Sequence, residues 1–445
     1  MKKENPIFVF LIIVLVFTGS IIVSCGSDSE GSEEPGMVDP DPDPEPDPLD
    51  CTENFNLELT LPGEEINLSD WDLIWTDDFD YPDAMLENNW TSQNGPSGHI
   101  LCSRWRENAE VKDGVLELKA IKENRGGQDW TCGSIWSKQT FGYGYFECRY
   151  KYAGAAGTNN SFWLFDRVIG INSSEVGCEL DINEGHFPNE VNTNRHHWTN
   201  GSSEFNSFAY SPGSSPAYAH SFNDIVKTNR IRFTSNNSGH FHIREFRIYE
   251  PNTDCYPTDL LSNSADTDVS GLNNLVRSND VTITSSGVLR DEFPVERIAD
   301  GNVGSSWVSQ KKGEKWIEFN WPTEKEIGHI QFINGWQDGT KWNALITDYK
   351  IEAEVNGEWV ELANFDAKIE NNHAEAYHTY GMDWDASTIK FYFDNKLLRE
   401  IPNTLCDKEL NIYLSLAIFE VAGEVTGAID GTSMKIDWVK YYQKK

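Results

Sequence analysis

The sequence predicts an all-β protein made of more than one β-sandwich, and three observations lead to this prediction. From residue 70 onward, short runs of alternating apolar and polar residues recur, as at 115–120, 143–152, 389–393 and 434–442. Gly, Asn, Asp and Pro separate such runs every ~8–12 residues, which is typical of antiparallel strands. No stretch longer than about ten residues has a helical period. Roughly 400 residues also exceed the needs of one sandwich, so two domains are expected.

The first 24 residues have the anatomy of a signal peptide. The charged residues Lys2 and Lys3 precede an apolar run at 7–23, which is short for a membrane span. The run ends in Ile-Val-Ser-Cys at Cys25, which resembles the lipobox of bacterial lipoproteins, where the cysteine carries the lipid. We therefore expect residues 1–24 to be removed and the chain to be held outside the cytoplasm by Cys25, in outer-membrane lipid. An uncleaved membrane anchor is the alternative.

Residues 25–50 are predicted to form an acidic, proline-rich tether. After Cys25 this segment contains ten acids, six prolines and no Lys or Arg. Like charges repel one another and proline lacks a backbone donor, so the segment is expected to stay extended. An acidic start after a lipidated cysteine resembles the export signal of surface-exposed lipoproteins, and we therefore expect the protein on the cell surface. A spacer that faces the periplasm is the alternative.

The composition excludes one class of partner and favours another. The formal net charge is −35, whereas binding to nucleic acid requires clustered Lys and Arg. The 16 Trp, 16 Tyr and 23 Phe residues offer ring faces on which sugars stack, although core packing accounts for many of them. We expect a monomer whose partner is a polysaccharide rather than a nucleic acid.

Besides Cys25 the chain contains seven cysteines, and their spacing matches no zinc pattern. They are Cys51, Cys102, Cys132, Cys148, Cys178, Cys255 and Cys406. A site outside the cytoplasm permits disulfides. Because seven is odd, at least one thiol is unpaired or pairs between chains. We expect a bridge between Cys102 and Cys132.

Three acids, Glu179, Asp181 and Glu184, occur in the short predicted strand Glu-Leu-Asp-Ile-Asn-Glu. Retaining glycoside hydrolysis needs two carboxyl groups about 5–5.5 Å apart, one to attack the anomeric carbon and one to protonate the leaving oxygen. On a regular strand the first two acids share a face and Glu184 points away, because side chains alternate. A β-bulge near residues 182–183 would return Glu184 to the same face. The alternative is the solvated face of an ordinary half-buried strand.

Several other segments, in the same order along the chain, resemble glycoside hydrolase family 16. They are residues 75–80, 108–120, 133–138, 141–147, 161–164, 378–384 and 436–442. The family pattern E-x-D-x-x-E contains the bulge and matches all three acids. The resemblance implies a jelly-roll sandwich of two curved antiparallel sheets, formed by residues 51–200 and 371–445, and a retaining endo-glycanase activity.

The resemblance also implies residue roles. Glu179 would be the nucleophile, Glu184 the acid/base, and Asp181 would share a proton or hydrogen bond with Glu179. The candidate substrate-binding residues are Trp163, His196, Trp136, Trp105 and Trp198, with Trp90 as a weaker candidate, and core packing is the alternative for each aromatic. No cofactor is required and no metal-ligand loop is present in the sequence. Structural calcium is common in the family, and Asp437 could contribute to it.

About 180 residues lie between the acid region and the next family-like segment, which is room for an inserted domain at 201–370. Residues 295–307 and 327–352 resemble a discoidin domain, the coagulation factor 5/8 C-terminal type. The strand expected last in that domain, at 243–250, precedes it here. We therefore interpret the insert as a circularly permuted discoidin-like β-sandwich, which is plausible because domain termini usually lie close together. An elaborated loop region with accidental similarity is the alternative.

The resemblance leaves the sugar open. The segment Ser-Phe-Trp-Leu at 161–164 and the acid strand resemble the galactan-cleaving members more than the laminarinases, so we expect an algal galactan of the agar, porphyran or carrageenan type. A β-1,3- or β-1,3-1,4-glucan is the alternative substrate. A sulfated galactan would need cations, and the arginines near the site segments are Arg104, Arg106, Arg167 and Arg195. A non-catalytic surface glycan-binding lipoprotein is the alternative of another class, although intact acids argue against it.

Overall fold

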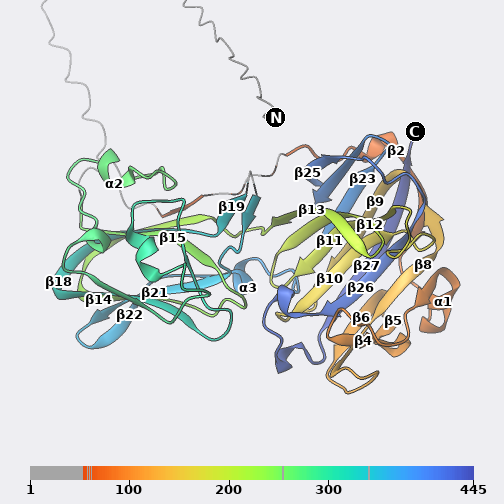
Figure 1. Ribbon diagram of the computed structural model, residues 1–445, viewed down its shortest axis with the longest axis horizontal. Helices are drawn as coiled ribbons and strands as arrows, with labels where there is room; N and C mark the ends of the chain where they lie inside the picture. The colour runs from red at the N-terminus through yellow and green to blue at the C-terminus, as the bar shows by residue number, and fades with distance from the viewer. Residues whose placement is uncertain (1–53, 58, 60, 62, 253–254, 339–340) are drawn as a thin grey trace, which may run out of the picture. The chain divides into compact units, whose positions relative to one another are not determined.

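The computed structural model describes residues 54–445 except 58, 60, 62, 253–254 and 339–340. The expected signal peptide, the lipidation site at Cys25 and the tether at 25–50 therefore lie outside the described residues. Strands dominate the part that is described, which confirms the all-β prediction (Figure 1).

Helices in the described chain are short. The α-helices are α1 (Leu86–Asn89), α2 (Ala265–Asp268) and α3 (Ala367–Glu370). None of the described helices has the length and apolar character needed to cross a membrane. This agrees with the lack of helical periodicity in the sequence.

Two sheets form the first sandwich (Figure 1). The first sheet contains, in spatial order and within the described residues, β13 (Ser202–Tyr210), β12 (Val191–Thr199), β11 (Gly177–His186), β10 (Thr158–Phe165), β26 (Leu410–Ile418), β8 (Ser134–Phe141) and β3 (Trp90–Ser92). The second contains β25 (Lys396–Pro402), β24 (Thr388–Phe393), β23 (His378–Trp384), β9 (Gly144–Lys151), β27 (Ser433–Lys444), β6 (Val115–Ile121), β7 (Trp130–Cys132) and β4 (Cys102–Arg104), with β2 (Trp71–Asp77) on β27 and β5 (Ala109–Lys112) on β6.

One hydrophobic core joins the two sheets of this sandwich, and the alternation along each strand determines which side chains enter it. On β10 and β11 the core residues are Phe162, Leu164, Leu180 and Ile182, each at most 1% exposed. The second sheet contributes residues such as Met382 to the same core. Since successive side chains on a strand point to opposite faces, the residues between these apolar positions lie on the outer face of the first sheet. We call this outer face the acid face, because it carries the three acids.

Two disulfides among the described residues stabilise this sandwich. Cys102 is bonded to Cys132, which confirms the predicted bridge and links the parallel neighbours β4 and β7. Cys178 is bonded to Cys406, which ties β11 to the loop before β26. Cys148 is buried and free, in agreement with the odd number of cysteines, whereas Cys255 is disulfide-bonded.

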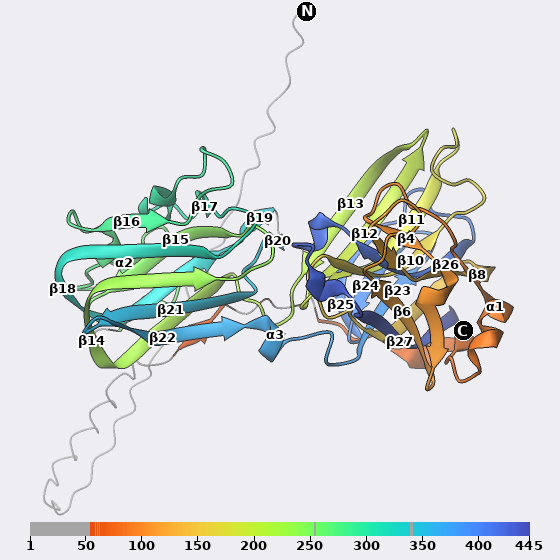
Figure 2. The same cartoon turned by 90° about the horizontal axis from the view of Figure 1, so that it is seen from below.

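The second sandwich is built on two long strands, β14 (Ala217–Ser235) and β18 (Lys315–Asn334), whose pairing is interrupted by register shifts (Figure 2). Its other strands are β17 (Trp307–Val308), β15 (His242–Tyr249), β21 (Asp348–Val355), β22 (Glu358–Asp366), β1 (Phe55–Asn56) and β16 (Thr282–Ser285). A separate hairpin pairs β19 (Trp336–Asp338) with β20 (Lys341–Asn343). An aromatic-rich core, which includes Phe233, Phe246 and Phe332, fills this sandwich. β15 pairs with β18, and the circular permutation of this sandwich stays a prediction.

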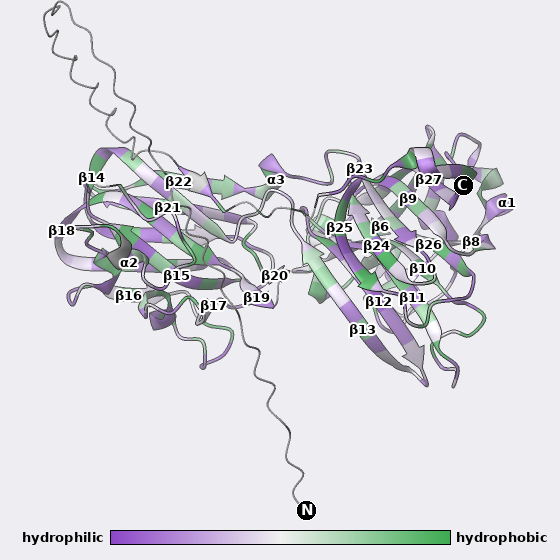
Figure 3. Cartoon of the chain, turned by 90° about the horizontal axis from the view of Figure 1, so that it is seen from above, coloured by the Kyte–Doolittle hydropathy of each residue, from purple (hydrophilic) through white to green (hydrophobic). Residues whose placement is uncertain are grey.

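The domain boundaries need correction at two places. We expected the first sandwich to end at residue 200, but β13 pairs with β12 along its whole length and extends the acid-bearing sheet to Tyr210. We also expected residues from 51 onward in the first sandwich, whereas β1 pairs with β14 of the second. In both cases the cause is an open strand edge, because unpaired backbone groups at an edge take up any available strand. Both hydrophilic and hydrophobic residues occur along β13, as expected for an exposed edge strand (Figure 3).

Candidate active site

The three acids lie on one face because β11 contains the predicted bulge. In the pairing of β10 with β11, Phe162 is opposite Asn183 and Trp163 is opposite Asp181, so Ile182 has no partner. This extra residue restores the alternation that a regular strand would break between Asp181 and Glu184. The structure thus confirms the bulge expected near residues 182–183.

Glu179 is half-buried and is held by the neighbouring strand β12. Its Oε2 accepts a hydrogen bond of 2.7 Å from Nε1 of Trp198. His196 lies directly opposite Glu179 in the strand pairing, and its ring stacks on that of Trp198 with centroids 5.6 Å apart. An indole donor on one oxygen fixes the carboxylate and leaves the other oxygen available to attack a bound sugar.

Asp181 is 2% exposed and lies between the other two acids. Burial, followed by the charge of Glu184, raises its pKa well above the ordinary value. Burial and the charge of Asp181 also raise the pKa of Glu179, to about 8. Since Asp181 is the more deeply buried, we assign the shared proton to Asp181. Its protonation removes the repulsion that disfavours the carboxylate of Glu179.

His196 connects this acid pair to the edge strand. Its Nε2 lies 3.3 Å from Oδ2 of Asp181, and its Nδ1 lies 2.8 Å from Oγ of Ser203 on β13. The serine thereby fixes the ring orientation, because a hydrogen bond at one ring nitrogen selects the role of the other. The structure brings His196 to the acids, as the resemblance implies.

Glu184 is held by two asparagine side chains. Nδ2 of Asn159, on β10, donates to Oε1 at 2.8 Å, and Nδ2 of Asn194, on β12, donates to Oε2 at 2.7 Å. The environment therefore differs from that of Glu179, which has an indole donor on one oxygen. Two neutral amide donors, one to each oxygen, fix the orientation of the carboxyl group.

Aromatic rings flank the acids on both sides along the sheet. On one side Trp163, opposite Asp181, contacts Tyr413 of β26 with centroids 4.2 Å apart, and Tyr413 contacts Trp136 of β8 at 5.9 Å. On the other side lie His196, Trp198 and Phe205, whose ring is 5.8 Å from that of His196. Trp163, Trp136 and Trp198 therefore occupy the surroundings expected of sugar platforms.

The remaining candidates lie elsewhere. Trp90 is fully buried, and its Nε1 donates to Asp77 at 2.8 Å, so it is a core residue and not a platform. Trp105 stacks with Arg125, and no contact among the described residues links it to the three acids. Asp437 forms an ion pair with Arg149. A carboxylate that is engaged by arginine does not suit a calcium site, and structural calcium stays a prediction without a defined set of ligands.

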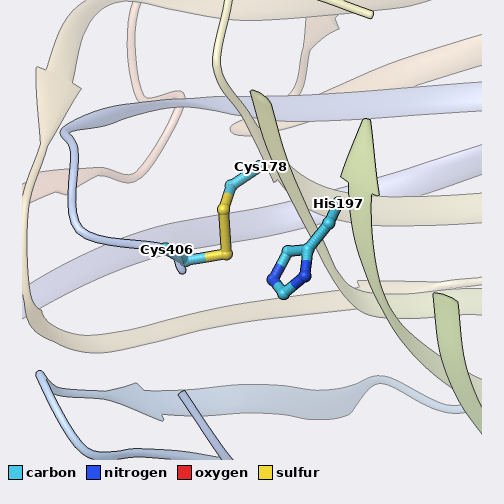
Figure 4. A group of neighbouring side chains, drawn as sticks. All are labelled: Cys178, His197 and Cys406. Atoms are coloured by element: carbon cyan, nitrogen blue, oxygen red, sulfur yellow. A yellow bond between two sulfur atoms is a disulfide. The ribbon is translucent and has the colours of Figure 1, made fainter. Parts of the chain in front are cut away.

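His197, Cys178 and Cys406 form a second cluster of ligand-type side chains, on the core side of β11 and β12 (Figure 4). Metal binding would require thiolates, but both sulfur atoms are used in the disulfide. We therefore assign this cluster a structural role. The disulfide anchors Cys178, the residue directly before Glu179 on β11.

Sequence reasoning missed several residues of the site. They are Asn159, Asn194, Ser203, Phe205 and Tyr413. A signal for the asparagines was present, because Asn159 is four residues before Trp163 and Asn194 two before His196, which places each on the same strand face as a candidate. No local signal marked Tyr413, which pairs with β10 from about 250 residues away along the chain.

Two family models match this chain. The model described as glycosyl hydrolases family 16 matches residues 99–261, and the model described as F5/8 type C domain matches residues 282–399. Each matched range extends from the strands of one sandwich into those of the other. The first runs into β14 and β15, and the second runs into β23, β24 and part of β25.

Curated relatives and solved structures are similar to this chain. The endo-1,3-1,4-beta-glycanase ExoK of Rhizobium meliloti is 30% identical over 168 residues, which are 36% of this chain and 58% of ExoK. The beta-glucanase of Bacillus licheniformis is 26% identical over 187 residues, 38% of this chain and 74% of that enzyme. The catalytic domain of an endo-1,3-beta-glucanase from Thermotoga petrophila aligns with 84% of this chain and 99% of its own, at 15% identity and a TM-score of 0.43.

The similarity is thus partial in extent, since the chain spans little more than half of ExoK. It nevertheless falls on the segment that contains the acid strand and its bulge. The chain therefore carries a domain of glycosyl hydrolases family 16 together with an F5/8 type C domain.

Proposed function

We propose that this protein is a retaining endo-glycosidase that cleaves β-linked bonds within a polysaccharide. The observation that carries the proposal is the bulge at Ile182, which places Glu179, Asp181 and Glu184 on one face with different partners. Two carboxyls in different environments on the same face are what double displacement requires. The family match and the names of the curated relatives support the same class of reaction.

The proposed reaction has two steps. In the first, Glu179 attacks the anomeric carbon while Glu184 donates a proton to the leaving oxygen, and the glycosidic bond breaks. In the second, Glu184 takes a proton from a water molecule. The water oxygen attacks the anomeric carbon, and the bond between this carbon and Glu179 breaks. Trp198 orients the nucleophile, Asp181 retains the shared proton, and His196 holds Asp181 in place.

We further propose an algal galactan as the substrate, with a β-1,3- or β-1,3-1,4-glucan as the second candidate. The Ser-Phe-Trp-Leu segment around Trp163 supports the galactan, and the curated relatives, which are glucanases and endo-1,3-1,4-beta-glycanases by name, support the glucan. Mass spectrometry of products from laminarin, lichenan, agarose, porphyran and carrageenans separates these candidates. A surface glycan-binding protein without activity would release no new reducing ends from any of them.

We also propose that Cys25 is lipidated and holds the protein on the outer face of the outer membrane. The apolar run before Cys25 and the acidic, proline-rich residues after it support this location. Cys25→Ala should move the protein from the membrane fraction to the soluble fraction. Protease treatment of intact cells tests the orientation. Digestion of wild type places it outside, whereas protection until the outer membrane is broken places it in the periplasm.

A further inference from the structure

Arg167 lies at the end of the aromatic row that begins beside the acids. It lies two residues after the end of β10, in a turn that Asp166 fixes by accepting hydrogen bonds from the backbone N–H groups of Val168 and Ile169, at 3.0 and 2.9 Å. The guanidinium lies over the ring of Trp136, 4.1 Å from its centroid. It also donates a hydrogen bond to the hydroxyl of Tyr413.

This arginine differs from the other three that the sequence placed near the site. Arg104 is buried and donates to backbone carbonyl oxygens. Arg106 forms ion pairs of 3.0 and 3.4 Å with two carboxylates. Arg195 lies on the core side of β12, beside His197 and 3.5 Å from Glu204. Arg167 is exposed, and no carboxylate of the described residues lies within ion-pair distance of it.

The position of the guanidinium changes what this end of the row can bind. It covers one ring face of Trp136, so that a sugar cannot stack on this face. It offers five N–H donors in a planar fork, of which the hydrogen bond to Tyr413 uses one. Stacking on a ring holds the fork in place at a low cost in side-chain freedom.

The distance from the three acids permits an anion at this end. Tyr413, whose hydroxyl accepts the hydrogen bond from Arg167, is on β26, two strands from β11, and strand spacing puts that separation at about 10 Å. The Debye length at physiological ionic strength is about 8 Å, so repulsion by the acids is largely screened there. The net charge of the chain is −35, so an exposed arginine without a carboxylate partner stands out.

We infer that Arg167 binds an anionic substituent, a sulfate ester or a carboxylate, on a substrate sugar that lies beside Tyr413. This inference rests on the proposed glycosidase function and names the chemistry of its substrate. A planar fork that pairs with two oxygens of the anion would make Arg167 a specificity-determining residue. Arg167 takes no part in bond cleavage.

The experiment compares matched polymers that differ only in charge. The full chain and its Arg167→Gln and Arg167→Lys variants are assayed for new reducing ends on porphyran and carrageenan, each before and after desulfation, and on laminarin before and after oxidation of its C6 hydroxyls to carboxylates. We expect wild type to have the higher kcat/KM on a charged form. Arg167→Gln should lose about 10- to 100-fold there and little on the matched neutral form.

Salt dependence and a second stacked arginine separate ligand binding from a structural role. The wild-type KM for the charged polymer should rise between 20 and 200 mM NaCl, Arg167→Lys should keep this dependence, and Arg167→Gln should lose it. Arg149→Gln is the control, because Arg149 stacks on Tyr377 in the other sheet. Sulfated and carboxylated polymers show which anion is bound.

Three results would overturn the inference. Equal losses on charged and neutral polymers would mean that Arg167 only supports the aromatic row. Faster cleavage of the neutral forms by wild type would show that Arg167 does not favour a charged substrate. In affinity gels, equal retardation of the inactive Glu179→Gln variant by charged and desulfated polymers would exclude the anion contact. By contrast, a wild-type protein that releases no reducing ends from any polymer contradicts the proposed function itself.

Discussion

The two sandwiches both bury carboxyl groups, but they surround them differently. In the second sandwich Glu245 is fully buried and has arginine partners: Nη2 of Arg277 lies at 2.8 Å and Nε of Arg247 at 3.8 Å. Its other oxygen accepts a hydrogen bond of 2.7 Å from the N–H of Gly301. In the first sandwich, Asp181 is nearly as buried, and no Arg or Lys of the described residues lies within 4 Å of it.

The difference separates a structural acid from a functional one. Burial raises the pKa of Glu245 too, but its arginine partners and the N–H of Gly301 oppose this rise and tie the carboxyl to neighbouring loops. Burial without such cations raises the pKa of Asp181 and of its neighbour Glu179, so a proton can move between groups near neutral pH. Exposure alone would not distinguish Glu245 from Asp181, whereas the partners of each carboxyl do.

The largest expected effect is on catalysis. Glu179→Gln removes the nucleophile but preserves the shape and the acceptor for Trp198, so turnover should fall by several orders of magnitude with the fold retained. Reducing-end assays and circular dichroism measure the two properties. Glu110→Gln, at a surface ion pair on β5, is the control and should leave turnover unchanged. A loss of less than tenfold for Glu179→Gln would remove Glu179 from the proposed role.

The matching change in the second sandwich should affect stability instead. Glu245→Gln removes one of the two carboxylates that Arg247 and Arg277 share, the other being Asp266, and should cost about 3 kcal/mol in the free energy of unfolding. Urea unfolding measures this change. Glu326→Gln, which removes an exposed ion pair with Lys227, should leave the free energy of unfolding nearly unchanged. If the two variants were equally stable, the contrast between structural and functional acids would lose its basis.

The protonated Asp181 should make stability depend on pH. Above its ordinary pKa of 3.8 the unfolded chain releases the proton that the folded chain keeps. The folded state then binds more protons, so the free energy of unfolding should fall as pH rises, with a slope of up to about 1.4 kcal/mol per pH unit from this group. Asp181→Asn should flatten the slope between pH 4 and 7, and the exposed Asp72→Asn should not. Parallel slopes for wild type and Asp181→Asn would show that Asp181 is ionised when folded.

The smallest expected effect concerns the edge strand β13. Phe205 is 64% exposed and lies in the row of His196 and Glu179, about 10 Å from the nucleophile by strand spacing. Phe205→Ala should raise KM for long oligosaccharides about threefold to tenfold, because one ring-stacking contact is lost. Phe205→Tyr should restore it. Oligosaccharides too short to reach β13 should show no change, and an equal loss on them would indicate a local packing defect instead.

Much of this fold follows from patterns in the sequence. Period-two runs predicted strands such as β6 and β24, and the acid spacing required the bulge at Ile182. The prediction of Trp90 as a platform is wrong, because a single tryptophan on a strand does not indicate which face is buried. The hydrogen bonds of Asn159 and Asn194 to Glu184 depend on the register of three strands, which no local pattern contains.

The other errors arise from strand pairing that the local pattern does not indicate. The prediction places β13 in the insert, but this edge strand belongs to the acid-bearing sheet: it buries little surface and still completes the site through Ser203. Tyr413 enters the aromatic row only because β26 pairs with β10. Such contacts are set by topology, so the sequence predicted the acids more completely than their surroundings.

The anomeric form of the first product tests the central claim most directly. If Glu179 is the nucleophile of a double displacement, a β-linked polymer must yield a product that is initially the β-anomer, because two inversions restore the configuration. A proton NMR time course, recorded faster than mutarotation, measures this on the first polymer that wild type cleaves. An early β-anomer signal is the predicted result. An early α-anomer signal would show direct attack by water and would contradict the role proposed for Glu179.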